Sequence, residues 1–160
     1  RHLPLLGYWM TETGRLNVIH HLWAYEDWND RAACRASLGT EKAWGEGFIP
    51  RAFVDVVAQE NLFLVTERTT PVFDAAVASR RTEHPAESPE TPLFSADCGA
   101  LALSDAPLAE DADAIAVFRV QSGQRPGSVL TLWPARAGLQ IAPGAAAWHE
   151  IIRPLGFSPL

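Results

Sequence analysis

Two apolar, aromatic runs joined by a short turn constrain this chain's fold more than any other feature of its sequence. Residues 5–11 and 17–25 are rich in β-branched and aromatic side chains, and Thr13-Gly14-Arg15 between them supplies turn chemistry. Such a pair predicts an antiparallel β-hairpin. Alternation divides the second run between two faces, and both carry bulky residues. We therefore expect this strand to lie between a layer of helices and a second sheet.

The sequence after the hairpin predicts two helices and a strand. Asp27 is a good N-cap for a helix over residues 28–38, which ends at a glycine. Apolar residues at helical spacing predict a second helix over residues 41–58, with Pro50 in its first turn or at a kink. Residues 61–67 then form a short strand with β-branched and aromatic side chains.

The sequence predicts that the second half is a weaker copy of the first. Residues 68–92 hold four prolines among Glu, Ser and Thr and predict a linker with a short helix over 72–80. A second hairpin follows over residues 114–120 and 128–133. The spacing Trp44-x-Glu46-x-x-x-Pro50 recurs as Trp148-x-Glu150-x-x-x-Pro154, which indicates an internal repeat. The predicted units are residues 1–67, the linker 68–92, and a degenerate second unit over 93–160.

Composition excludes several classes of protein. With 48% hydrophobic and 20% charged residues the chain is globular, and its net charge of -6 gives no basic surface for nucleic acid. No apolar run approaches the roughly 20 residues of a membrane-spanning helix. Cys34 and Cys98 lie far apart and predict free, buried or half-buried thiols. We expect a cytoplasmic protein, although an organellar or secretory leader before Arg1 stays open.

The run LLGYWMTETGRLNVIHHLWAYEDWNDR resembles the signature stretch of the NIPSNAP family. That signature is an aromatic strand ending in Thr-Glu-x-Gly, then Leu-Asn, His-Leu-Trp-x-Tyr, an acidic turn and a helix. The continuation RAACRASLGTEKAWGEGFIPRAF and the strand NLFLVTE are similar to the family's next elements. The resemblance covers residues 1–67.

The resemblance implies an α+β fold of the ferredoxin-like, dimeric α/β-barrel type, with antiparallel sheets covered by helices. In that superfamily the open face of one sheet is buried against a second sheet, from another subunit or a tandem repeat. The family's first strand and helix have no counterpart before Arg1 here. We therefore expect either further residues beyond the given ends or pairing with another chain, most simply in a homodimer. The internal repeat in turn predicts a tandem arrangement with a degenerate second copy.

The candidate site residues lie on or beside the first hairpin. His21 matches the family's histidine and shares a predicted face with Trp23 and Tyr25. It acts either as an acid, base or metal ligand, with Tyr25 and Glu12 as the other catalytic candidates, or as a buried core histidine. Glu12 is either a carboxylate at the mouth of a pocket or an acceptor of hydrogen bonds from the backbone of the hairpin. Asn17 either binds the ligand or forms hydrogen bonds within the hairpin turn.

Two functional hypotheses follow. In the first, Trp9 completes an apolar site with the residues above, and the chain binds a small apolar or aromatic molecule between its sheets, with or without monooxygenase-, isomerase- or dehydratase-like turnover. In the second, the chain is an interaction or scaffold protein with a filled core. Metal is not expected, because His20 faces away from His21 and no further ligands converge. The sequence requires no cofactor; haem is an option only through a single histidine used by distant relatives.

Overall fold

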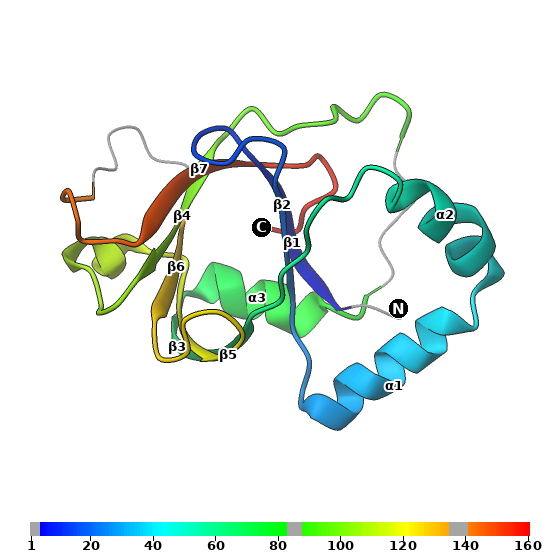
Figure 1. Cartoon of the computed structure of the whole chain (residues 1–160), viewed down its shortest axis with the longest axis horizontal. Helices are drawn as coiled ribbons and strands as arrows, with labels where there is room; N and C mark the ends of the chain where they lie inside the picture. The colour runs from blue at the N-terminus through cyan, green and yellow to red at the C-terminus, as the bar shows by residue number, and fades with distance from the viewer. Residues whose placement is uncertain (1–3, 83–87, 135–140) are drawn as a thin grey trace.

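The computed structural model describes residues 4–82, 88–134 and 141–160. Within these ranges seven strands form one antiparallel sheet in the order β2-β1-β7-β4-β6-β5-β3, which curls into a half-barrel (Figure 1). The strands are β1 (Leu5–Thr11), β2 (Ile19–Trp23), β3 (Phe63–Thr69), β4 (Gly99–Ser104), β5 (Ala116–Ser122), β6 (Val129–Trp133) and β7 (Trp148–Pro154). The helices are α1 (Trp28–Gly39), the π-helix η1 (Ala43–Phe48), α2 (Ile49–Ala52), α3 (Pro71–Ser79) and the 3-10 helix η2 (Ala109–Asp113).

The predicted first hairpin is confirmed. Strands β1 and β2 pair antiparallel, with Tyr8 opposite His21 and Trp9 opposite His20. The turn needs a glycine, because Gly14 has a φ of +82°. Because β1 also pairs with β7, the first and last strands along the chain lie side by side in the sheet. The α+β prediction is therefore confirmed, whereas the tandem, dimeric barrel stays a prediction.

The main core fills the concave side of the sheet. Helix α3 lies inside the curl (Figure 1). Its Phe73 packs edge-on against Phe118 of β5, with ring centroids 5.6 Å apart. Trp9, Leu132 and Ile152 belong to the same core. A smaller core on the convex side is centred on Trp133 and is covered by loop residues.

Several other local predictions are confirmed. Helix α1 begins after Asp27, whose carboxylate accepts a hydrogen bond from the Asp30 amide, and it ends at Gly39. The short helix in the linker is α3, and the second hairpin is formed by β5 and β6. Both cysteines are free, Cys34 buried and Cys98 half-buried. The predicted linker lies partly outside the described residues, at 83–87.

The second helix over residues 41–58 is wrong as predicted. The structure has the π-helix η1 followed by the four-residue α2, which ends at Ala52. Gly45 and Gly47 weaken the helix, Pro50 lacks an amide donor, and β-branched valines follow. The repeated Trp-x-Glu-x-x-x-Pro spacing does not mark equivalent elements either, because its first copy is helical and its second lies in β7. The division into two units stays a prediction.

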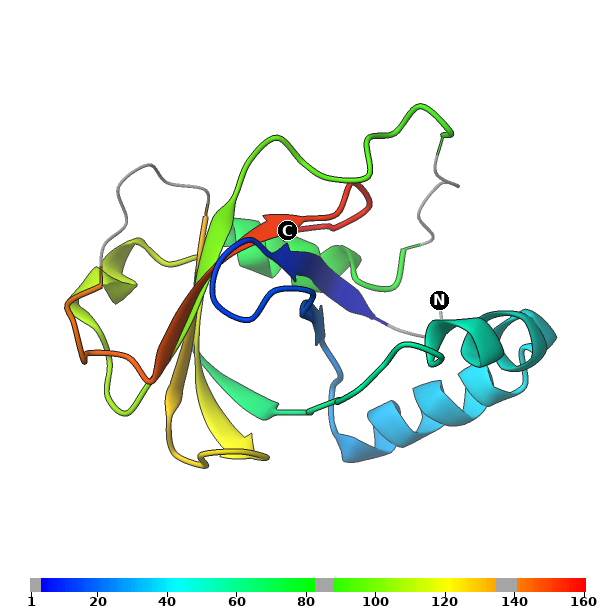
Figure 2. The ribbon, with the colours of Figure 1, turned by 45° about the horizontal axis from the view of Figure 1, so that its top comes forward.

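Residues 28–57 form what we call the helical arm, which extends away from the sheet (Figures 1 and 2). Its contact with the sheet includes Trp28, whose ring lies 4.1 Å from that of Phe63, and Arg31, which lies over the same ring. Large apolar side chains of the arm stay exposed, namely Trp28, Phe48, Phe53, Val54, Val56 and Val57. No helix in the described part of the chain is long and apolar enough to cross a membrane.

Candidate functional site

The predicted aromatic face of the first hairpin is present, at the edge of the sheet. The His21 ring lies 5.7 Å from Tyr8 and 5.4 Å from Trp23, and Tyr8 also contacts Phe157. Burial lowers the pKa of His21, and the neighbouring His20 lowers it further. Burial also raises the pKa of Tyr25. His21 is therefore a neutral imidazole beside aromatic rings near neutral pH, able to accept or donate one hydrogen bond.

The other predicted site residues do not converge on His21. Glu12 is exposed and forms an ion pair with Arg153, 2.8 Å apart. Asn17 has a φ of +63° and belongs to the hairpin turn. Trp9 is 5% exposed and belongs to the concave core, because it alternates with Tyr8 along β1. The structure thus separates Trp9 from the aromatic group around His21, and the predicted catalytic set stays untested.

Sequence reasoning missed a buried polar group formed by His20 and Glu150. Nε2 of His20 lies 2.8 Å from Oε2 of Glu150, whose side chain is 2% exposed. Nε of Arg15 donates to Oε1 of the same carboxylate across 3.5 Å. The His20 ring also stacks on Trp148, with an interplanar angle of 14°. The two partners lie 130 residues apart, so no local spacing could have revealed them.

The geometry around Glu150 shows a structural role. The hairpin turn closes over the carboxylate, since a Cβ on Gly14 would lie 2.9 Å from Cγ of Glu150. His20 and Arg15 satisfy the buried charge from the hairpin, while Glu150 belongs to β7. A buried carboxylate held in this way fixes the hairpin to the last strand of the sheet.

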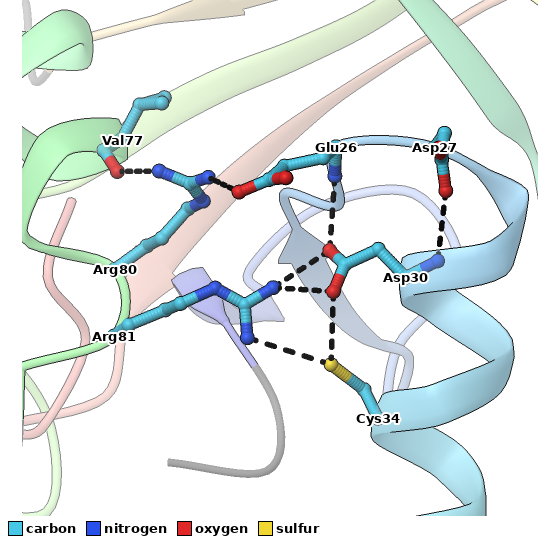
Figure 3. Close-up of polar contacts among 7 residues, drawn as sticks. All are labelled: Glu26, Asp27, Asp30, Cys34, Val77, Arg80 and Arg81. Carbon is cyan, nitrogen blue, oxygen red and sulfur yellow. Dashed lines mark hydrogen bonds and ion pairs between the residues drawn. The ribbon is translucent and has the colours of Figure 1, made fainter.

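A second polar cluster fastens the helical arm to the end of α3. Both oxygens of Asp30 lie 2.6 Å from Nη2 of Arg81, and Arg80 contacts Glu26 across 3.3 Å (Figure 3). The thiol of Cys34 lies 3.6 Å from Asp30 and from Arg81 (Figure 3). A hydrogen bond from the Glu26 amide and the contact with Arg81 lower the pKa of Asp30. The cluster stabilises the arm's position and leaves its outer face open.

One concave feature of the described residues is an apolar cavity of about 590 Å³, which we call the C-terminal cavity. It lies where β4 begins and β6 and β7 end, between the concave core and the segments 91–99 and 154–160. Trp9, Ile115, Leu132 and Leu160 form its apolar wall. Asp97 and Cys98 also line it. The volume falls within the range of small-molecule sites.

The described residues contain no group of three or more His, Cys, Asp or Glu side chains placed to hold a metal ion.

Comparison with known proteins identifies a protein family for the first part of the chain. The NIPSNAP family model matches residues 1–71. Residues 1–71 belong to the NIPSNAP family. This NIPSNAP segment contains the first hairpin, the helical arm, β3 and the start of α3.

The similar curated proteins are much longer than the matched part. NipSnap homolog 3B of Mus musculus is 40% identical over 67 residues, which cover 40% of this chain and 27% of that protein. NipSnap homolog 3A of Homo sapiens and of Pongo abelii are each 39% identical over the same length and shares. No solved structure matches the chain.

The NIPSNAP segment supplies only one wall of the C-terminal cavity. Trp9 comes from this segment, whereas the remaining described lining residues come from positions 91–160. The buried polar group is divided in the same way, with His20 inside the segment and Glu150 outside it. Both features therefore depend on residues outside the NIPSNAP segment as well as on residues within it.

Proposed function

We propose that this chain binds a small, largely apolar molecule in the C-terminal cavity. The observation that carries the proposal is the cavity itself, about 590 Å³ in volume and walled by Trp9, Leu132 and Leu160. Its size and apolar lining with a few polar groups are those of a typical ligand site. The rigid indole of Trp9 offers a flat surface to an aromatic ligand.

The walls of the cavity are held in place by backbone contacts. The Ser95 amide donates to the Pro154 carbonyl across 2.9 Å, and the Gly156 amide donates to the Leu93 carbonyl across 2.9 Å. The two segments approach so closely that a Cβ on Gly156 would lie 2.1 Å from the Pro92 carbonyl oxygen. Walls that are already paired lose little conformational entropy when a ligand enters.

The proposal concerns binding and includes no reaction. His20 and Glu150 do not line the cavity, and among its described lining residues Asp97 and Cys98 carry the reactive groups. His21, Tyr25 and Glu12 lie elsewhere on the first hairpin and its flanks, so turnover of the monooxygenase, isomerase or dehydratase kind is not part of it.

Calorimetric titration with 2-naphthylmethanol tests the proposal. Ala96 is exposed and lines the cavity, so Ala96→Phe fills the mouth without disturbing the core. Ala36→Phe is the matched control, because Ala36 is exposed on α1 and lies outside the lining. We expect saturable 1:1 binding that Ala96→Phe weakens at least tenfold and Ala36→Phe leaves unchanged. Equal effects of the two substitutions, or no binding, would refute the proposal.

The exposed apolar face of the helical arm favours a second function, assembly with another copy of this chain. Val54 and Val57 are 73% and 102% exposed, and four further large apolar residues of the arm accompany them. A surface of this kind is typical of interfaces. Sedimentation velocity should show a dimer that Val57→Asp dissociates and Val72→Asp, on exposed α3 surface, does not; a concentration-independent monomer would exclude it.

A further inference from the structure

The C-terminal cavity carries a formally negative side chain at its mouth. Asp97 is the one formally charged side chain among the described residues that line it, and it has no ion-pair partner in the described part of the chain. Its side chain is exposed. A ligand that reaches the cavity mouth meets this negative charge.

Several polar donors around the cavity are already used within the chain. The Ser158 hydroxyl donates to the Leu160 carbonyl and accepts from the Tyr8 amide. The backbone amides of Ser95, Leu155 and Gly156 donate to the carbonyls of Pro154, Tyr8 and Leu93. A ligand carboxylate or phosphate would lose hydration and lie near the like charge of Asp97, which disfavours its binding.

The guanidinium of Arg153, near the cavity, already has an ion-pair partner. The guanidinium of Arg153 lies over the ring of Phe94, a lining residue, at 5.9 Å from the ring centroid. Its Nε also lies 2.8 Å from Oε1 of Glu12. Because this carboxylate already neutralises it, Arg153 does not make the cavity selective for anions.

Resting on the proposed function, we propose that the ligand of the C-terminal cavity is a neutral or cationic molecule that carries a hydrogen-bond donor, such as an apolar alcohol or amine, and not an organic acid. The apolar body packs against Trp9 and Leu132. The hydroxyl or ammonium group points to the mouth, where Asp97 accepts its hydrogen bond. Coulomb attraction across solvent-exposed distances of this kind changes affinity by on the order of fivefold.

Three probes with the same ring system test this inference: 2-naphthylmethanol, 2-naphthylmethylamine and 2-naphthoate, titrated by calorimetry at pH 7.5. We expect the amine to bind as tightly as the alcohol or up to about fivefold tighter, and the carboxylate to bind about tenfold more weakly than the alcohol. In Asp97→Asn the advantage of the amine should disappear and the carboxylate should bind severalfold better. Asp55→Asn makes the same charge change at an exposed position outside the lining and should change neither ratio.

The outcomes separate the two proposals. If the carboxylate binds as tightly as the alcohol, or if Asp97→Asn changes the ratios no more than Asp55→Asn does, the ligand class is wrong while the cavity still binds ligands. If none of the three probes binds, the proposed function is wrong and the ligand class is wrong with it. Raising the salt concentration should reduce the amine's advantage, since Asp97 is exposed.

Discussion

Replacing His20 by leucine should be costly, because it leaves a buried carboxylate without its closest partner. Glu150 is 2% exposed, and the Nε2 atom of His20 lies 2.8 Å from its Oε2. A carboxylate only accepts hydrogen bonds, so Nε2 donates to it. Arg15 remains at 3.5 Å, but its side chain is 59% exposed and compensates only in part. Breaking a buried pair costs about 3–5 kcal/mol, and the partial compensation places His20→Leu near 3 kcal/mol.

Replacing Glu150 instead of His20 distinguishes the cost of an unpaired buried charge from the cost of losing the contact alone. In Glu150→Leu the charge is gone, and His20 keeps its stacking on Trp148 and some access to solvent, so we expect a cost of about 1 kcal/mol. The double variant should be more stable than His20→Leu alone, because two apolar side chains then face each other. The coupling energy should be about 2–3 kcal/mol.

Urea unfolding followed by tryptophan fluorescence measures these free energies, and Trp148 places a probe against His20. The reasoning is refuted if the two single costs add within about 0.5 kcal/mol in the double variant. It is also refuted if His20→Leu costs less than Glu150→Leu, because the carboxylate would then not depend on the histidine.

Three further predictions follow from single contacts. Gly14→Ala should destabilise the chain by more than about 1 kcal/mol in urea unfolding, because the φ of +82° and the approach to Glu150 both disfavour a Cβ, and an unchanged midpoint would contradict this. Arg81→Ala should speed hydrogen exchange in the amides of α1 while leaving those of β4 unchanged, because it removes the contacts with Asp30 and Cys34; equal exchange in α1 would contradict the role given to the cluster. Burial lowers the pKa of His149 in the fold despite the nearby Glu150 charge, so its contribution to stability is complete above about pH 6.5 and is lost as the pH falls from there through the lowered pKa. His149→Asn should flatten this part of the stability profile, and an unchanged profile would show that the group does not control it.

Local elements of the fold could be predicted from the sequence, because each depends on a few neighbouring residues. The first hairpin follows from alternation and from the turn at Gly14, and α1 follows from its cap at Asp27. The arm could not be predicted in detail, since two glycines and Pro50 divide what otherwise has helical spacing. Strand order was out of reach, because β7 pairs with strands that begin far away in the sequence.

The candidate site was predicted only where alternation was enough. Alternation correctly separated His21 from His20. It could not show which face would be covered, because that depends on α3 and on the segment after β7. His20 was set aside as a metal ligand for a sound geometric reason, yet its partner Glu150 comes from the far end of the chain. Of the predicted site residues, only Trp9 lines the C-terminal cavity.

The location of a bound ligand tests the central claim most directly. Nuclear Overhauser effects between the naphthyl protons of 2-naphthylmethanol and the assigned side chains of the protein report contacts within a few ångströms. The account predicts effects to Trp9, Leu132 and Leu160, which wall the C-terminal cavity. Effects to Phe48 and Phe53 of the helical arm, with none to the cavity, would contradict it.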